Sequence, residues 1–411
     1  MPSVLAPVTA KTVKPAAAPP GALVQAVLDD PTALVYFLVN VGDGDTQLLL
    51  LPPDSNDDLR RLVVVDVATA GKLPALIEAL HAVQLPSAPG EDRRLIEAPG
   101  SPGQIRLLVA THPHADHIGG MCDLLRRYNN AGGCIDQFWE PGYFFPSPTF
   151  HQLMTQLETS PWIRRLQPTS GTTCYFDTVK ITVLGPGVGL RTRFDTYGVD
   201  VNDASITLMV EYPAVQMYAE TDPGRDRQNR RMISRRNWRL LLGADAQFTS
   251  WAQATVDFPD LKQTQNPVLA KELDAARSNR DYLSADVFKL SHHASKHGVS
   301  LELMERAGAS YTLVSSVSGG GSYNFPHALA MDAAREARQA IAKSGARRQT
   351  DHDLGIHATG GVLAGRAQQP LGSIAVLIPQ HPRPTGRLRL FRLLDEPRAR
   401  IDLAGAREVV T

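Results

Sequence analysis

Short apolar runs alternate with polar, glycine-rich and proline-rich segments along most of the chain, and such runs predict β-strands. Residues 34–40 and 46–51 are two of these runs, and the Gly-Asp-Gly-Asp segment at residues 42–45 predicts that they form a hairpin. Residues 62–67 and 105–110 are further strand candidates. Later in the chain, strands are predicted at residues 179–184, 206–212, 239–242, 287–290 and 311–315.

Helical periodicity separates several of the predicted strands. Residues 86–102 form a loop by their proline and glycine content. The alternation of strands and helices fits an α/β (α+β) fold of two sheets with helices outside them, an αββα sandwich. Apolar positions at helical spacing predict helices at residues 72–83, 120–128, 246–256, 301–307 and 328–343.

The ends of the chain differ in composition from its middle. Residues 1–21 are rich in proline and alanine, which predicts a disordered arm. Residues 22–345 are then expected to form the main domain, without internal repeats. The apolar segments 371–377 and 388–393 predict a small β-rich tail, so residues 346–411 are interpreted as a short C-terminal extension beyond the core.

Charge and cysteine content narrow the class of protein. The 411 residues carry 42 Lys and Arg against 42 Asp and Glu, so no global charge draws the chain toward nucleic acid or a membrane. The three cysteines, Cys122, Cys134 and Cys174, have no CxxC spacing, which argues against thiolate metal ligation and suits a reducing cytoplasm. No apolar run approaches the ~20 residues of a membrane span. We therefore expect a cytoplasmic protein.

Residues 110–120, with the sequence ATHPHADHIGG, hold three histidines and an aspartate within six residues. His112 and His114 point to the same side of an extended stretch and can bind one metal ion. Asp116 and His117 follow the turn and can reach a second ion. Imidazole nitrogens and carboxylate oxygens are ligands for zinc, manganese or iron. The alternative is a polar loop that holds histidines by chance, although the chain has only 12 of them.

This loop resembles the HxHxDH hallmark of the metallo-β-lactamase fold superfamily. The resemblance is greater to one branch, the hydrolase domain of the ComEC/Rec2 DNA-uptake proteins and its stand-alone relatives. Four further segments resemble that branch in order: residues 39–45 (VNVGDGD), 63–66 (VVVD), 241–245 (LLGAD) and 289–295 (KLSHHAS). The resemblance spans roughly residues 34–330 and implies a metal-dependent hydrolase with the αββα fold. Channel-linked DNA uptake is not implied, because no membrane channel accompanies these segments.

The resemblance also implies roles for single residues. Asp245 would bridge two ions, and His292 would complete the second site, with His293 as its competitor or as a residue that orients a ligand. Asp66 would approach the bound water or hold the loop. His327 would protonate a leaving oxygen, hold a phosphate or have no role. The expected ligands of two Zn²⁺ or Mn²⁺ ions, or of one, are His112, His114, Asp116, His117, Asp245 and His292, and the candidate catalytic residues are Asp66, Asp116 and His327.

One ligand that the superfamily usually carries is missing. The Leu-Gly-Pro-Gly turn at residues 184–187 has no histidine after it. Residues 202–205 (NDAS) resemble the NxxS motif of the ComEC branch, which also tends to lack this histidine, so Asn202 and Ser205 are candidates for substrate binding. Asp203 or His151 could replace the missing ligand. Without a replacement, one ion would bind weakly or not at all.

Residues 220–239 form an insert with seven arginines and few acids. It is either a solvated hairpin tip or a loop that contacts phosphate, because arginine binds phosphate oxygens bidentately. The candidates for substrate binding in this insert are Arg230, Arg231, Arg235 and Arg236.

The functional hypothesis is a phosphodiesterase or nuclease that uses a metal-activated water, with nucleic acid as its substrate. The first alternative is a hydrolase of another ester or amide, such as a lactone, a thioester or a choline phosphoester, because fold does not fix substrate. The second is a metal-binding module without turnover. The arginine-rich insert separates these hypotheses, because a nuclease has a use for it and a small-ester hydrolase does not.

Overall fold

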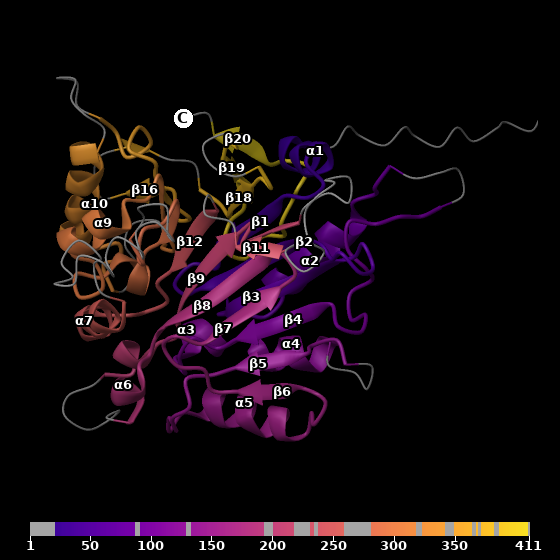
Figure 1. Ribbon diagram of the computed structural model, residues 1–411, viewed down its shortest axis with the longest axis horizontal. Helices are drawn as coiled ribbons and strands as arrows, with labels where there is room; N and C mark the ends of the chain where they lie inside the picture. The colour runs from indigo at the N-terminus through magenta and orange to yellow at the C-terminus, as the bar shows by residue number, and fades with distance from the viewer. Residues whose placement is uncertain are drawn as a thin grey trace, which may run out of the picture.

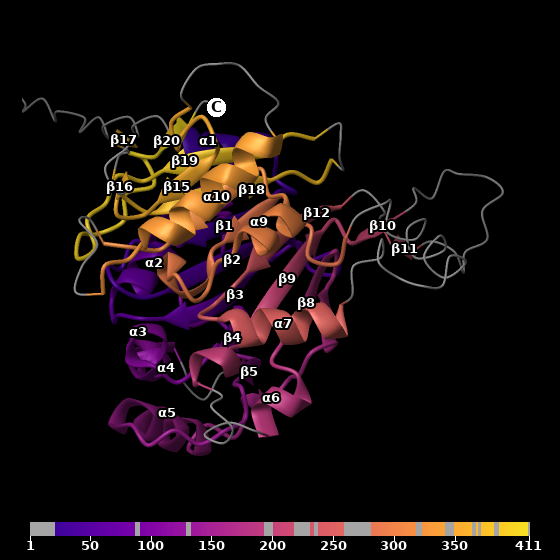
Figure 2. The same ribbon diagram turned by 90° about the vertical axis from the view of Figure 1, so that its left-hand side faces the viewer.

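The computed structural model describes residues 21–86, 91–128, 133–192, 200–217, 231–233, 237–258, 281–317, 323–341, 349–363, 367–368, 371–381 and 386–409. Two large sheets pack face to face with helices on their outer surfaces, as Figures 1 and 2 show from two directions. The predicted αββα sandwich is confirmed.

The first sheet has the strand order β20-β19-β18-β1-β2-β3-β4-β5-β6. Strands β1 to β3 are antiparallel, whereas β3 to β6 run parallel to one another. The bounds of the strands are β1 Leu34–Leu38, β2 Thr46–Pro53, β3 Arg60–Val67, β4 Ile105–Val109, β5 Gln137–Trp139, β6 Arg164–Leu166, β18 Ile374–Ile378, β19 Arg389–Arg392 and β20 Arg407–Val409.

The second sheet has the order β15-β14-β13-β12-β9-β8-β7. Strands β12 to β15 are parallel, and β7 to β9 are antiparallel. Two short hairpins, β10–β11 and β16–β17, complete the described strands. The bounds are β7 Thr173–Phe176, β8 Val179–Gly185, β9 Thr207–Tyr212, β10 Val215–Met217, β11 Arg231–Ile233, β12 Trp238–Leu242, β13 Val287–Lys289, β14 Tyr311–Val314, β15 Ile356–Ala358, β16 Val362–Leu363 and β17 Ala367–Gln368.

Three apolar layers hold the sandwich together. Alternate residues of both sheets meet in the central layer, where side chains such as Val63 and Leu107 pack with Leu208 and Leu240. A second layer joins the outer face of the first sheet to α1 (Ala22–Asp29), α2 (Lys72–Ala82), α4 (Met121–Tyr128) and α5 (Pro148–Glu158). The third layer joins the second sheet to α7 (Phe248–Asp257), α9 (Leu301–Ala307) and α10 (Ala328–Ile341).

The C-terminal strands differ from the prediction. They do not form a tail beyond the core, because β18 pairs with β1 along its whole length, from Leu34↔Ile378 to Leu38↔Ile374. Leu390 and Phe391 of β19 are fully buried. The physical reason is that β1 is apolar on both faces and would otherwise leave an open, aggregation-prone edge. Residues 1–20, which contain the predicted arm, lie outside the described residues.

Two further expectations concern cysteines and membranes. Cys122, Cys134 and Cys174 are all free thiols. Within the described ranges, none of the helices combines the length and the apolar character that crossing a membrane requires.

Several loops converge where parallel strands end. Asp66 lies at the end of β3, residues 110–117 follow β4, Asp245 follows β12, and the turn at residues 291–294 follows β13. The parallel register of β3 with β4 and of β12 with β13 aligns these ends. Side chains that follow parallel strands meet at one edge of a sheet, and here the edges of two sheets contribute to the same place.

Candidate metal centre

The loop after β4 brings its histidines together. His114 is the N-cap residue of the short helix α3 (Ala115–Ile118), which turns the chain so that His117 faces back toward His112. The ring centroids of His112 and His117 are 4.0 Å apart, and both rings are fully buried. His114 is partly exposed, and its ring lies edge-on to His112 at 4.9 Å. The three predicted histidine ligands therefore form one cluster.

Asp245 stands between two groups of histidines and turns a different oxygen to each. Its Oδ2 lies 3.7 Å from His112 Nε2 and 3.7 Å from His292 Nε2. Its Oδ1 lies 3.2 Å from His117 Nε2 and 3.7 Å from His293 Nε2. A carboxylate placed in this way can share its two oxygens between two ions.

Asp116 joins the Oδ1 side of this cluster. Its Oδ2 lies 3.6 Å from His293 Nε2 and 3.9 Å from His117 Nε2. Asp116, His117, Asp245 and His293 each offer one ligand atom, and these four atoms lie within 4.8 Å of one another. Such a set can surround one ion with little movement, because metal–ligand bonds of about 2.0–2.2 Å place neighbouring ligand atoms about 3.0–3.5 Å apart.

Unsatisfied atoms show that these residues suit a metal. His112 Nε2, His117 Nε2, both ring nitrogens of His293 and Asp245 Oδ1 are buried without a hydrogen-bond partner. Buried polar atoms without partners are rare in folded proteins because each one costs free energy. Their convergence on one point, together with the nitrogen and oxygen donor set, fits a transition-metal ion.

Asp66 orients His117 from behind. Its Oδ2 is 2.7 Å from His117 Nδ1, and the carboxylate also accepts hydrogen bonds from Thr111 N at 2.8 Å and Thr111 Oγ1 at 2.7 Å. The carboxylate is fully buried, and both of its oxygens are engaged. Of the two roles that the sequence left open, the hydrogen bonds favour holding the loop over approaching a bound water. Such a carboxylate fixes the tautomer and direction of a ligating histidine.

Asp45 holds the corresponding place behind His293. Its Oδ1 is 3.7 Å from His293 Nδ1, and its Oδ2 accepts a hydrogen bond from the fully buried Lys289 Nζ. Asp45 N donates to Asp116 O at 2.9 Å. Gly44 makes this close approach possible, because a Cβ there would lie 2.5 Å from the same carbonyl oxygen. Sequence reasoning matched this segment but gave Asp45 and Lys289 no role, although a lysine inside an apolar strand was an available signal.

The electrostatic surroundings differ among the expected ligands. Burial would lower the pKa of His117 and His293, but neighbouring carboxylates outweigh it and raise the pKa of both rings. Burial alone would raise the pKa of Asp245, but the neighbouring His117 and His293 outweigh it and hold that pKa well below the usual range. Burial lowers the pKa of both His112 and His292. These two rings therefore stay neutral with a free lone pair, which metal binding requires.

Backbone strain concentrates in the same loops. Nine non-glycine residues of the described chain have a positive φ, and five of them lie here. A left-handed conformation costs a non-glycine residue roughly 1–2 kcal/mol, and such strain gathers at functional sites. The five residues are Asp66, Ala244, His292, His293 and Ala294, with φ of 58°, 45°, 49°, 51° and 61°.

His327 lies beside the turn that carries the two late histidines. Its backbone N–H donates to Ala294 O at 2.9 Å. Its ring Nδ1 accepts a hydrogen bond from Leu329 N at 3.2 Å, at the start of α10. This bond makes Nε2 the proton-bearing nitrogen of the neutral ring, so His327 is set up as a donor.

The two residues proposed to replace the missing ligand are placed elsewhere. Asp203 is buried, and its Oδ1 accepts hydrogen bonds from Ser250 N and Ser250 Oγ, both at 3.3 Å, at the start of α7. His151 is exposed on α5. The contacts of these two residues therefore do not support either one as the replacement. Asn202, in contrast, reaches the cluster, with its Nδ2 3.4 Å from His292 Nε2.

The arginine-rich insert lies mostly outside the described residues, including Arg230, Arg235 and Arg236. Arg231 begins β11, where the backbone alone is described. Arg239 differs from the expectation, because it lies inside β12 and is only 5% exposed. Its guanidinium donates to Glu211 Oε1 at 3.2 Å and to the carbonyl oxygens of Asp281 and Ser284. Arg239 therefore stabilises the second sheet and is not part of a phosphate-contacting loop.

Aromatic side chains flank the cluster on two sides. Phe145 lies edge-on to His114 at 5.5 Å. On the other side Phe325 stacks on His293 with centroids 6.0 Å apart, and Tyr323 stacks on Phe325, also at 6.0 Å. Tyr323 is 70% exposed. The stacked rings of Phe325 and Tyr323 thus extend from the candidate ligand His293 to solvent.

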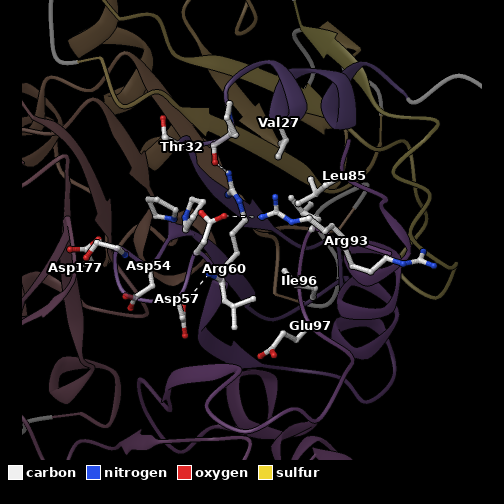
Figure 3. A pocket seen from close by; sticks show the side chains of 18 of the residues that line it. Val27, Thr32, Asp54, Asp57, Arg60, Leu85, Arg93, Ile96, Glu97 and Asp177 are labelled. Carbon is white, nitrogen blue, oxygen red and sulfur yellow. Dashed lines mark hydrogen bonds and ion pairs between the residues drawn. The ribbon is translucent and has the colours of Figure 1, made fainter. Parts of the chain in front are cut away.

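A separate cavity of about 1360 Å³ lies beside the hairpin between β2 and β3 (Figure 3). Arg60, which lines it, begins β3, whereas Asp66 at the metal cluster ends that strand, about 20 Å away at ~3.3 Å per residue. Some of the charges that line it are paired with each other, as between Arg93 and Asp58 at 2.8 Å. The cavity therefore does not belong to the metal centre.

Comparison with known proteins supports the fold more than any substrate. Residues 60–151 match the model of the metallo-beta-lactamase superfamily, a stretch that includes β3 and the loop of the first three histidines. No curated protein matches the chain.

Three solved structures are similar in outline. A variant of the CmlA beta-hydroxylase has 10% identity and a TM-score of 0.37, covering 82% of this chain and 53% of that chain. The metallo-beta-lactamase fold protein YhfI from Bacillus subtilis has 11% identity and a TM-score of 0.35, and the match covers 75% of this chain and 93% of that chain. A diphosphatase from the PhnP family has 12% identity and a TM-score of 0.33, and the match covers 84% of this chain and 99% of that chain. The chain thus spans about half the length of the hydroxylase.

Proposed function

We propose that this chain, which contains a metallo-beta-lactamase superfamily domain, is a metal-dependent phosphodiesterase that acts on nucleic acid as a nuclease. The single observation that carries the proposal is the position of Asp245 between two groups of histidines, each group near a different carboxylate oxygen. The carboxylate of Asp245 and the histidines on either side of it would hold two ions, either Zn²⁺ or Mn²⁺, which would supply an activated water and positive charge for a displacement at phosphorus.

The protein's own side chains prepare this site before substrate arrives. Asp66 lies behind His117 and fixes the direction of its ring through a hydrogen bond, and Asp45 faces the ring of His293 at 3.7 Å. His327 carries its proton on Nε2 and lies beside the turn of the late histidines, so we assign it protonation of the leaving oxygen. Asp116 contributes negative charge on the more exposed side of the cluster.

The stacked rings of Phe325 and Tyr323 support a nucleic-acid substrate. An exposed ring such as Tyr323 at the end of a stack is a platform for a base, because every base has a π-face. Asn202 reaches the cluster, and the buried Ser205 lies three residues later in the chain. Both are proposed to contact the substrate, as in the ComEC/Rec2-like branch to which we assign the chain. A cytoplasmic location, which free cysteines suit, belongs to the same proposal.

The same rings also favour a second candidate function. Phe145 and Tyr323 would hold the apolar acyl part of a lactone or thioester as readily as a base. A metal-activated water attacks such a carbonyl carbon as well as phosphorus. Hydrolysis of another ester is therefore the competing activity.

A substrate panel separates the two. The full chain, loaded with Mn²⁺ or Zn²⁺, is incubated with single-stranded DNA, single-stranded RNA, bis-p-nitrophenyl phosphate, a lactone and a thioester. We expect cleavage of the three phosphodiesters, abolished by a chelator and restored by metal. Turnover of the lactone or thioester without cleavage of any phosphodiester would replace the proposal by its competitor.

A further inference from the structure

The gap in the expected ligand set lies on one side of Asp245. His112 and His114 come from the first loop, but the turn at residues 184–187 supplies no third histidine. The nearest imidazole to this side is that of His292. Its Nε2 lies 3.7 Å from Asp245 Oδ2, which is the oxygen that also lies 3.7 Å from His112 Nε2.

His293 faces the other side. Its Nε2 lies 3.7 Å from Asp245 Oδ1 and 3.6 Å from Asp116 Oδ2. The two neighbouring rings have centroids 6.3 Å apart and planes inclined by 69°, so they diverge toward different oxygens of one carboxylate.

The backbone explains how consecutive residues can do this. In a strand, neighbouring side chains point to opposite faces of the sheet. Here His292 has φ 49° and ψ 48°, and His293 has φ 51° and ψ 31°, so both are left-handed. This turn aims both rings at Asp245. It is held by hydrogen bonds from His292 N to Ala244 O at 2.8 Å and from His327 N to Ala294 O at 2.9 Å.

Asn202 lies against the same ring. Its Nδ2 is 3.4 Å from His292 Nε2, whereas its Oδ1 and His292 Nδ1 are buried without a hydrogen-bond partner. Asp203 and His151, the other candidates, are respectively engaged by Ser250 and exposed on α5.

We propose that His292 and His293 are ligands of two different ions in one dinuclear centre, and that His292 replaces the missing histidine. His292 then shares its ion with His112, His114 and Asp245 Oδ2, whereas His293 shares the other with Asp116, His117 and Asp245 Oδ1. This assignment deepens the proposed function, on which it rests only in requiring that the chain binds metal.

Metal counting without substrate tests the assignment. Mn²⁺ bound per full-length chain is measured by mass spectrometry after equilibrium dialysis, with affinities from calorimetry. Glycine is the replacement of choice, because it removes the ligand and fits a left-handed backbone without strain. We expect two ions in the parent, one in His292→Gly and one in His293→Gly, with an affinity loss of at least ~100-fold for the affected ion.

Double variants show which residues share an ion. Residues that bind the same ion have non-additive effects, whereas residues that bind different ions have additive ones. His112→Ala combined with His292→Gly should therefore still keep one ion, and His292→Gly combined with His293→Gly should keep none. His151→Ala is the matched control and should keep two.

Two results would overturn the assignment. One is two ions of parental affinity in His292→Gly. The other is loss of both ions when His112→Ala and His292→Gly are combined, because that places them at different ions. Since no substrate is present, a parent that binds two ions but cuts no phosphodiester would refute the proposed function and leave the ligand assignment standing.

Discussion

The histidines of the metal centre depend on the carboxylates behind them. Asp66 is fully buried and is engaged by the backbone and hydroxyl of Thr111 and by the ring of His117. Asp45 pairs with the buried Lys289 and faces His293. The ring of His117 thus has its direction fixed by a carboxylate that is not among its expected metal ligands, which raises metal affinity because less ordering is needed on binding.

Removal of Asp66 should weaken metal binding without removing a ligand. Asp66→Ala leaves His117 Nδ1 and the Thr111 hydroxyl without their partner. We expect an affinity for Mn²⁺ reduced by about 10–100-fold, measured by calorimetry on folded protein. The exposed Asp57→Ala is the control and should bind as the parent does. Equal affinities in Asp66→Ala and the parent would exclude the orienting role.

At this scale the sequence identified residues that the structure brings together, but it did not identify the hydrogen-bond partners behind them. His112, His114, Asp116 and His117 could be identified because they are close together in the chain. Asp45 and Lys289 are 244 residues apart, so their pairing could not be predicted from spacing. The different directions of the neighbouring histidines depend on backbone angles that a motif does not contain.

Strands of the second sheet are linked by a buried ion cluster. Glu211 of β9 lies 2.7 Å from Lys180 of β8 and 3.2 Å from Arg239 of β12. Burial alone would raise the pKa of Glu211, but Arg239 and Lys180 lower it to about 2. Strand β9 and its two neighbours, β8 and β12, are therefore joined by charge as well as by the hydrogen-bond ladder.

This cluster predicts a pH dependence of stability. The folded-state pKa of Glu211 lies below its unfolded value of 4.5, so its contribution is complete above about pH 4.5 and is lost as the pH falls toward 2. Glu211→Gln should lower the free energy of unfolding by about 3 kcal/mol at pH 7, and the difference should shrink below pH 4.5. Urea unfolding at several pH values measures this. The exposed Glu158→Gln should show no such trend, and a pH-independent deficit in Glu211→Gln would contradict the ion cluster.

Elements with strong local signals were predicted, and those that depend on partners were not. Strands such as β3 and β4 have continuous apolar runs and were expected. The helix α5 was missed although Ser147, its N-cap, and Pro148 at its start are signals for a helix. The pairing of β18 with β1 was missed because the choice of a strand's neighbour is a property of the whole fold.

The whole molecule has no net charge, so any attraction of a polyanion must be local. The insert at residues 220–239 concentrates arginines and connects β9 and β10 to β12 in the second sheet. Local positive charge raises the concentration of an anionic substrate without requiring a basic protein.

Replacement of Arg230, Arg231, Arg235 and Arg236 by serine tests this idea. We expect weaker binding of single-stranded nucleic acid and a flatter salt dependence, with the slope reduced by about 0.7 for each phosphate that the variant no longer neutralises. Hydrolysis of bis-p-nitrophenyl phosphate should barely change, because that substrate does not reach the insert. Parental binding across a salt series would show that the insert is a solvated hairpin.

The proposed activity depends on Asp245, whose two carboxylate oxygens would each bind a different ion. The most direct measurement is the rate of phosphodiester cleavage by Asp245→Ala and by the parent, with bound Mn²⁺ counted in the same samples. We expect the rate to be at least ~10²-fold lower in Asp245→Ala, together with loss of bound metal, because the bridging charge is gone. An unchanged rate in a folded, metal-loaded Asp245→Ala protein would contradict this role of Asp245.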